Sequence, residues 1–315
     1  MAPLVCGGCC DARAVAAVPV VAVQRSRRAA DGAHRRARGG AREAGRAAAN
    51  PGVQGYSPPP PPVSPIKGLI DFHTHAAPDI FGRALDDDEL ATLAATRQME
   101  AVVFKNHVTH TADRAFLVRK HVPGIKVFGG IALNHAVGGL NPQAVEWMWR
   151  MQGGDGRVVW FPTFDADNHV KRAGTAPAGI RVLDERGQVL PAARAVLKIC
   201  AAQRLVVQTG HASPDEALAL IAAAREEGCE HIVVTHAQFD VVGMSLAHMK
   251  KAAALGAKLE LCALLMLAGP TSPLEFLHHT ARVEVSDTAA RIKEGITRDQ
   301  IVTMGRETPG SLLAG

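Results

Sequence analysis

Short apolar runs alternate with helical patterns along most of this chain, and that alternation constrains its fold more than any other feature. The runs are Gly68–His75, Ala101–His107, Lys126–Leu133, Val158–Thr163, Leu205–His211, His231–Ala237 and Lys258–Ala263. The helical patterns between them are Asp86–Met99, Thr111–His121, Asn141–Met151, Pro191–Gln203, Pro214–Glu227 and Val242–Leu255. Strands separated by helices at this spacing predict parallel pairing with helical crossovers.

Seven near-continuously apolar strands favour a TIM-type (β/α)8 barrel, an α/β fold, over an open sheet. A doubly wound sheet would place a glycine-rich phosphate loop after its first strand, and none follows Gly68–His75. We therefore expect a barrel domain over residues 67–315.

Histidines recur where the predicted strands end. Since side chains alternate across a strand, Asp71, His73 and His75 share one face of the first strand. Lys105 and His107 end the second strand, His211 the fifth and His236 the sixth, while His135 follows the third and His169 lies in the run after the fourth. A barrel gathers the carboxyl ends of its strands at the active-site face, so this placement predicts one metal site there.

The same segments resemble the amidohydrolase superfamily of metal-dependent barrels, and more closely a small, poorly characterised bacterial and fungal branch of it. The resemblance covers about residues 67–268 and rests on Ile70–Asp79, Val102–His107, Gly130–Asn134, Gly138–Pro142, Val159–Thr163 and Thr209–His211. It implies that His73, His75 and His211 are metal ligands and that His236 is a fourth ligand or an acid/base. It also implies that Lys105 and His107 face the same pocket.

The implied function is hydrolysis of an amide, lactone or ester of a small molecule by a metal-activated water. Zinc is the expected ion, and Lys105 would stabilise an oxyanion or hold a substrate carboxylate. The fourth strand offers neither the lysine nor the glutamate that bridges two metals in many superfamily members, so one ion is expected unless Lys105 bridges. A decarboxylase on the same scaffold is the nearest alternative.

The superfamily's usual base is an aspartate at the end of strand eight, and here the pattern departs. Asp287 ends the short run Arg282–Asp287, but Ser286 also begins a good N-capped helix. In relatives of this branch such a helix precedes strand eight, whose Ser-Asp-Leu-Gly-Gln-like motif is absent from this chain. We favour a block missing between Glu294 and Gly295, with Asp287 as the true base kept as the other interpretation. A catalytically impaired metal-binding barrel, with free edges that invite self-association into a homo-oligomer, is then the rival to an enzyme.

Residues 1–66 are rich in Ala, Arg and Pro and predict a disordered leader and linker. The first fifty residues hold nine Arg, no Lys and three acidic residues. Their net charge therefore exceeds the +5 of the whole chain. The remainder is nearly neutral and only 4% of the whole chain is aromatic, which predicts no nucleic-acid partner; no apolar run is long enough for a membrane span. We expect a cytoplasmic protein, or a mitochondrial one if the leader is a transit peptide.

The six cysteines do not predict a disulfide framework. Cys200, Cys229 and Cys262 are isolated in or beside apolar segments and are expected to be reduced core residues. Cys6, Cys9 and Cys10 have no second Cys/His pair at zinc-finger spacing.

Overall fold

The computed structural model describes residues 64, 66–174, 178–262 and 297–314. The predicted leader up to residue 63, with its three cysteines, lies outside the described residues, and so does Asp287. No helix in the described part of the chain has the length and apolarity that a membrane crossing requires.

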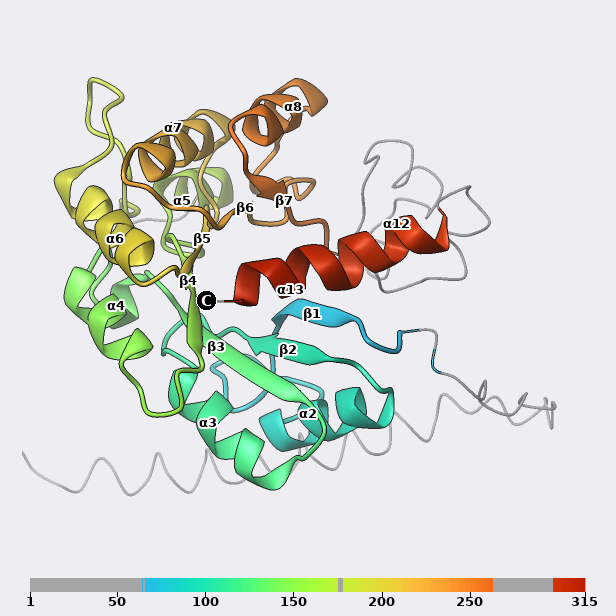
Figure 1. The fold of residues 1–315 in the computed structure, drawn as a ribbon. Coiled ribbons are helices and arrows are strands. Elements are labelled where there is room, and N and C mark those ends of the chain that lie inside the picture. The colour runs from blue at the N-terminus through green and yellow to red at the C-terminus, as the bar shows by residue number, and fades with distance from the viewer. Residues whose placement is uncertain (1–63, 65, 175–177, 263–296, 315) are drawn as a thin grey trace, which may run out of the picture. The chain divides into compact units, whose positions relative to one another are not determined.

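The strands form one parallel sheet in which spatial order follows chain order. They are β1 (Ile70–Thr74), β2 (Ala101–Phe104), β3 (Lys126–Ala132), β4 (Gly156–Trp160), β5 (Val206–Gln208), β6 (Ile232–Val234) and β7 (Lys258–Leu259). A doubly wound sheet reverses its strand order at a switch point, and this sheet does not. It curls into a seven-stranded half-barrel (Figure 1).

Helices cross between successive strands: α2 (Asp87–Thr96), α3 (Ala112–His121), α4 (Pro142–Trp149), α5 (Asp167–Ala173), α6 (Pro191–Ala202), α7 (Pro214–Glu226) and α8 (Leu246–Ala254). Six of them match the predicted patterns within a few residues at each end, and α5 was not predicted. Local chemistry fixes the starts. In α7 the Ser213 side chain accepts from the backbone N–H of Glu216, whose carboxylate accepts from the Ser213 N–H.

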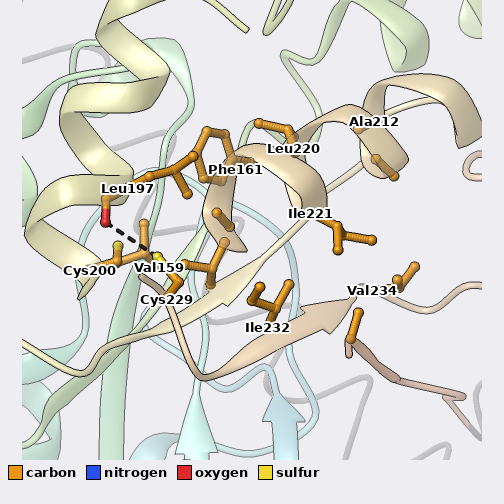
Figure 2. Close-up of a cluster of buried hydrophobic side chains, with 14 of the residues drawn as sticks. Val159, Phe161, Leu197, Cys200, Ala212, Leu220, Ile221, Cys229, Ile232 and Val234 are labelled. Carbon is orange, nitrogen blue, oxygen red and sulfur yellow. Dashed lines mark hydrogen bonds between the residues drawn. The ribbon is translucent and has the colours of Figure 1, made fainter. Parts of the chain in front are cut away.

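The main core lies between the outer face of the sheet and the helices (Figure 2). Its residues include Val159 and Phe161 near β4, Leu197 and Cys200 of α6, Leu220 and Ile221 of α7, and Ile232 and Val234 of β6. The Cys229 thiol donates to the Leu197 carbonyl at 3.3 Å. Cys200 and Cys229 are thus buried free thiols, as predicted. Each large side chain fully buried here contributes roughly 1.5–3 kcal/mol of transfer free energy.

The C-terminal segment lies against β1 (Figure 1). It comprises α12 (Arg298–Val302), a π-helical stretch η2 (Thr303–Glu307) and α13 (Thr308–Leu313). Two leucines of α13 join a buried cluster contributed by several strands: Leu312 and Leu313 with Ile70, Phe72, Trp160, Val206 and Val233.

Among the described residues, β1 pairs with β2 and β7 pairs with β6, so the sheet stays open between β1 and β7. Residues 263–296, where the sequence left the eighth strand open, lie outside the residues that the structure describes.

Candidate functional site

The register of the sheet brings the carboxyl ends of its strands to one rim. Thr74 pairs with Phe104, Trp160 with Gln208, and Val234 with Leu259, so the next residues along each strand emerge at similar heights. These positions carry the side chains that the sequence singled out, together with Glu260 directly after β7. The polar rim is therefore a consequence of parallel pairing.

Six imidazole rings follow one another around this rim, and we call them the histidine arc: His107, His75, His73, His236, His211 and His169. Successive ring centroids lie 4.8, 5.2, 5.8, 4.9 and 4.9 Å apart in that order. The structure thus brings together all four predicted metal ligands and His107. His135 is exposed and points its backbone N–H at Asp165, so it is not part of the arc.

His73 lies at the centre of a chain of three hydrogen-bonded groups. Its Nδ1 is 2.6 Å from Oε1 of Glu260, and its Nε2 is 3.0 Å from Nζ of Lys105. Because a carboxylate only accepts, Nδ1 carries the proton, and Nε2 then accepts from the lysine. These two hydrogen bonds fix the tautomer of the His73 ring and the orientation of all three side chains.

Glu260 is 3% exposed and its carboxylate is fully engaged. Besides His73, Oε1 accepts from the His236 backbone N–H at 3.1 Å and from the Cys262 thiol at 3.3 Å, while Oε2 accepts from Gln208 Nε2 at 2.9 Å. Burial alone would raise the pKa of Glu260, but the facing His73 holds it well below its usual range. The residue is a buried carboxylate anion beneath the arc.

His107 is positioned by two polar neighbours. Thr163 Oγ1 lies 2.9 Å from His107 Nδ1 and also accepts from Asn134 Nδ2 at 2.7 Å. Since Asn134 donates to the hydroxyl, the hydroxyl keeps its own proton available to donate to His107 Nδ1. The neutral ring then keeps its own proton on Nε2, so His107 can donate a hydrogen bond to a bound molecule.

Burial disfavours the charged form of most rings of the histidine arc. Desolvation, reinforced by neighbouring cations, lowers the pKa of His107 to about 2 and of His236 to about 3. The pKa values of His75 and His211 also fall well below the usual range for the same reason. Burial lowers the pKa of Lys105 to about 8, against an opposing pull from Glu260. Neutral imidazoles are the form that binds metal ions.

Two fully buried nitrogens of the arc have no hydrogen-bond partner among the described residues. They are Nδ1 of His75 and Nδ1 of His236, and both atoms are buried. A buried polar atom without a partner is costly, and a ligand that it can coordinate removes the cost. Nitrogen donors left open in this way fit a divalent metal ion.

The arc lines a cavity of about 1520 Å³, which continues along the gap between β1 and β7 toward the C-terminal helices. Phe81 and Phe164 stand at its mouth, 45% and 39% exposed, with ring centroids 5.5 Å apart. Lys105 is the buried cation of its wall and lies over the Trp160 ring at 5.1 Å. The walls suit a small organic molecule with an apolar part and an electron-rich polar part.

Three residues of this site were not predicted as functional. Glu260 follows a short strand whose alternation gives no sign of a partner, and His169 lay in the run after the fourth strand without an assigned role. Cys262 was predicted to be a core residue, which is wrong: it is half-buried and its thiol faces Glu260. Its position two residues after Glu260 on the same strand face was the available signal.

In its fold, this half-barrel α/β protein is similar to solved organophosphorus hydrolases. A mutant organophosphorus hydrolase is 12% identical with a TM-score of 0.54 over 80% of this chain and 94% of its own. A lactonase template engineered for organophosphate hydrolysis is 12% identical with a TM-score of 0.54, over 80% of this chain and 97% of its own. A mutant organophosphorus hydrolase from Deinococcus radiodurans is 14% identical with a TM-score of 0.49, over 80% of this chain and 95% of its own.

The chain itself belongs to DUF6282, a family of unknown function, whose match covers residues 68–260. That range runs from the start of β1 to Glu260. No curated protein matches the chain.

Proposed function

We propose that this protein is a metal-dependent hydrolase of the amidohydrolase type that cleaves an amide, lactone or ester of a small molecule. The observation that carries the proposal is the histidine arc, in which neutral imidazoles from four strand ends meet at one cavity. Scattered core or surface histidines would not converge in this way.

His73, His75, His211 and His236 would hold the ion, which we propose to be zinc. The unpartnered Nδ1 atoms of His75 and His236 support this choice because each is a buried donor in need of a ligand. When bound, such an ion supplies an acidified water and polarises a carbonyl oxygen.

The chain's own residues prepare the substrate. Lys105, 1% exposed and hydrogen-bonded to His73, presents a positive charge in a dry pocket where an oxyanion or a carboxylate would lie. His107 offers its Nε2 proton to a substrate oxygen, since Thr163 occupies Nδ1. Phe81 and Phe164 cover the mouth and reduce access of bulk water.

Asp287 is the base that the sequence offers for moving the proton from the attacking water to the leaving group. It lies outside the described residues, so its role rests on the sequence alone. An Asp287→Asn variant with unchanged turnover would remove it from the mechanism.

Metal content and hydrolysis measured together test the proposal. The full chain carries Cys6→Ser, Cys9→Ser and Cys10→Ser, so that thiols of the leader cannot bind metal; this triple variant is the parent. It is compared by elemental analysis with a His73→Ala, His75→Ala double variant, and with His121→Ala as a control on the surface.

We expect about one divalent ion per chain in the parent and the control, and little in the double variant. Equal metal in all three would refute the metal site. Activity is screened on amides, lactones, esters and organophosphates; the last join the panel because the fold is shared with the hydrolases named above. Bound metal without turnover on any of them would favour the catalytically impaired barrel.

A further inference from the structure

Three different metal-binding atoms meet between the ends of β1 and β7. Among the described residues, His73 Nδ1, Glu260 Oε1 and Cys262 Sγ all lie within 4.8 Å of one another. The separations are 2.6 Å from nitrogen to oxygen, 3.3 Å from sulfur to oxygen and 3.9 Å from sulfur to nitrogen. This group shares His73 with the proposed four-histidine site, and His73 can be a ligand of one of the two ions at a time.

These spacings are close to what one tetrahedral ion requires. With zinc bonds of about 2.0–2.3 Å to nitrogen, oxygen and sulfur, tetrahedral ligands stand roughly 3.4–3.6 Å apart. Two of the three separations lie within a few tenths of an ångström of that range, and the third opens by less than one ångström. Small side-chain rotations of His73 and Cys262 would supply the difference, while Glu260 is fixed by Gln208 and the His236 backbone.

We propose that His73, Glu260 and Cys262 form a metal position with a thiolate ligand; when His73 serves this ion, the histidine site beside it keeps His75, His211 and His236. Oε1 of Glu260 now accepts one proton from the His73 ring and one from the Cys262 thiol. An entering dication takes the place of both hydrogens: the thiol proton leaves to solvent and the ring proton moves from Nδ1 to Nε2. One positive charge is lost and two are gained beside a buried carboxylate.

The tautomer change has a consequence for Lys105. Its ammonium donates to His73 Nε2 at 3.0 Å, and two donors cannot share that contact once Nε2 carries the proton. Lys105 then turns away from His73, and the Trp160 ring already lies 5.1 Å from its Nζ as a cation–π partner. The ion therefore frees Lys105 toward the cavity.

A sulfur ligand also decides which ions are accepted. Thiolate favours zinc and cobalt, whereas magnesium and manganese prefer carboxylate, carbonyl and water. The proposal deepens the proposed function, on which it rests through the shared His73. It predicts a site that discriminates against hard cations, which a site of histidines and carboxylates would do less strongly.

Cobalt spectroscopy tests the sulfur ligand directly. The parent lacking the three leader cysteines is titrated with Co²⁺, and Cys262→Ser is compared with Cys200→Ala, whose thiol is buried in α6. We expect a near-ultraviolet sulfur-to-cobalt charge-transfer band in the parent and in Cys200→Ala, and its loss in Cys262→Ser with visible d–d bands retained. Circular dichroism verifies that each variant is folded.

The two proposals fail separately. Visible cobalt bands without the sulfur band, or a sulfur band that survives Cys262→Ser, would overturn the thiolate ligand and leave the histidine site standing. A parent that binds neither cobalt nor zinc would overturn both. A second measurement tests the thiolate ligand without replacing Cys262. Zn²⁺ should slow the alkylation of Cys262, measured by peptide mass spectrometry, and an unchanged rate would count against Cys262 as a ligand.

Discussion

Replacing Glu260 by glutamine removes one buried negative charge and keeps the shape of the side chain. The carboxylate accepts four hydrogen bonds, from His73, the His236 backbone, Cys262 and Gln208. Bonds to a charged group are worth about 1.5–3 kcal/mol each and neutral ones about 0.5–1.5 kcal/mol. Since the four share one group and are not additive, we expect Glu260→Gln to lower the free energy of unfolding by about 2–4 kcal/mol.

Leucine at the same position should cost more. Glu260→Leu leaves the donors of His73, His236 and Gln208 unpaired in the interior, at about 1–3 kcal/mol each. The matched control is Glu226→Gln, which weakens an exposed pair with Arg194 at 2.8 Å and should cost much less than either change at Glu260.

Urea unfolding followed by circular dichroism on metal-free protein measures all three variants. The pH dependence adds a second signature. Because the folded pKa of Glu260 is lowered, its stabilisation is complete above the ordinary value of 4.5 and is lost as the pH falls below it. The glutamine variant should lack that acid-sensitive part. If Glu260→Gln cost no more than Glu226→Gln, the buried carboxylate hydrogen-bonded to His73 would be wrong.

Three further outcomes follow from the structure. In metal-free protein, the lowered pKa values of His107 and His236 mean that these side chains bind protons in the unfolded chain but not in the folded one. The free energy of unfolding therefore falls as the pH drops below about 6.5, by roughly 1–2 kcal/mol per histidine at pH 5. Gly210→Ala should destabilise by several times the roughly 1 kcal/mol expected of Gly174→Ala, because both have φ near +64° but a Cβ at 210 would lie 2.2 Å from the Phe161 oxygen. Leu313→Ala should lower the unfolding free energy by about 2–4 kcal/mol.

Denaturation at several pH values and at fixed pH checks these outcomes. A flat profile between pH 7 and 5 would show that the arc is charged or exposed. Equal costs at Gly210 and Gly174 would mean that the backbone conformation, and not the close approach, sets the effect. Leu255→Ala, at a position 39% exposed, is the control for Leu313→Ala, and similar losses would contradict the burial of the C-terminal leucines.

Much of the fold could be read from the sequence because the strands are short and apolar, and because α2, α4, α7 and α8 begin with side-chain N-caps. Parallel pairing in chain order then places the ends of all strands together, so the convergence of His73, His75, His211 and His236 was predictable from their positions alone. The choice of a barrel-type sheet over a doubly wound one follows from the same pattern and the missing glycine-rich loop.

Glu260 could not be predicted because its role depends on a partner 187 positions away. A glutamate between two leucines at the end of a short edge strand resembles a solvent-facing residue, whereas in the structure Glu260 is buried against His73. The prediction for Cys262 was wrong for a similar reason, since an isolated cysteine beside apolar residues is ordinarily a core residue. The role of α13 was also invisible: Leu312 and Leu313 follow a proline and two small residues, a pattern that does not indicate burial.

The seating of α13 has a consequence for how the protein is made. Leu312 and Leu313 pack with Ile70 at the start of β1, so β1 is not covered until the chain past residue 310 has been made. A ribosome adding 5–20 residues per second needs on the order of 10–50 s to synthesise the chain between them. During that interval Ile70, Phe72 and Trp160 lack the leucines that cover them, and the nascent chain presents an apolar surface that chaperones bind.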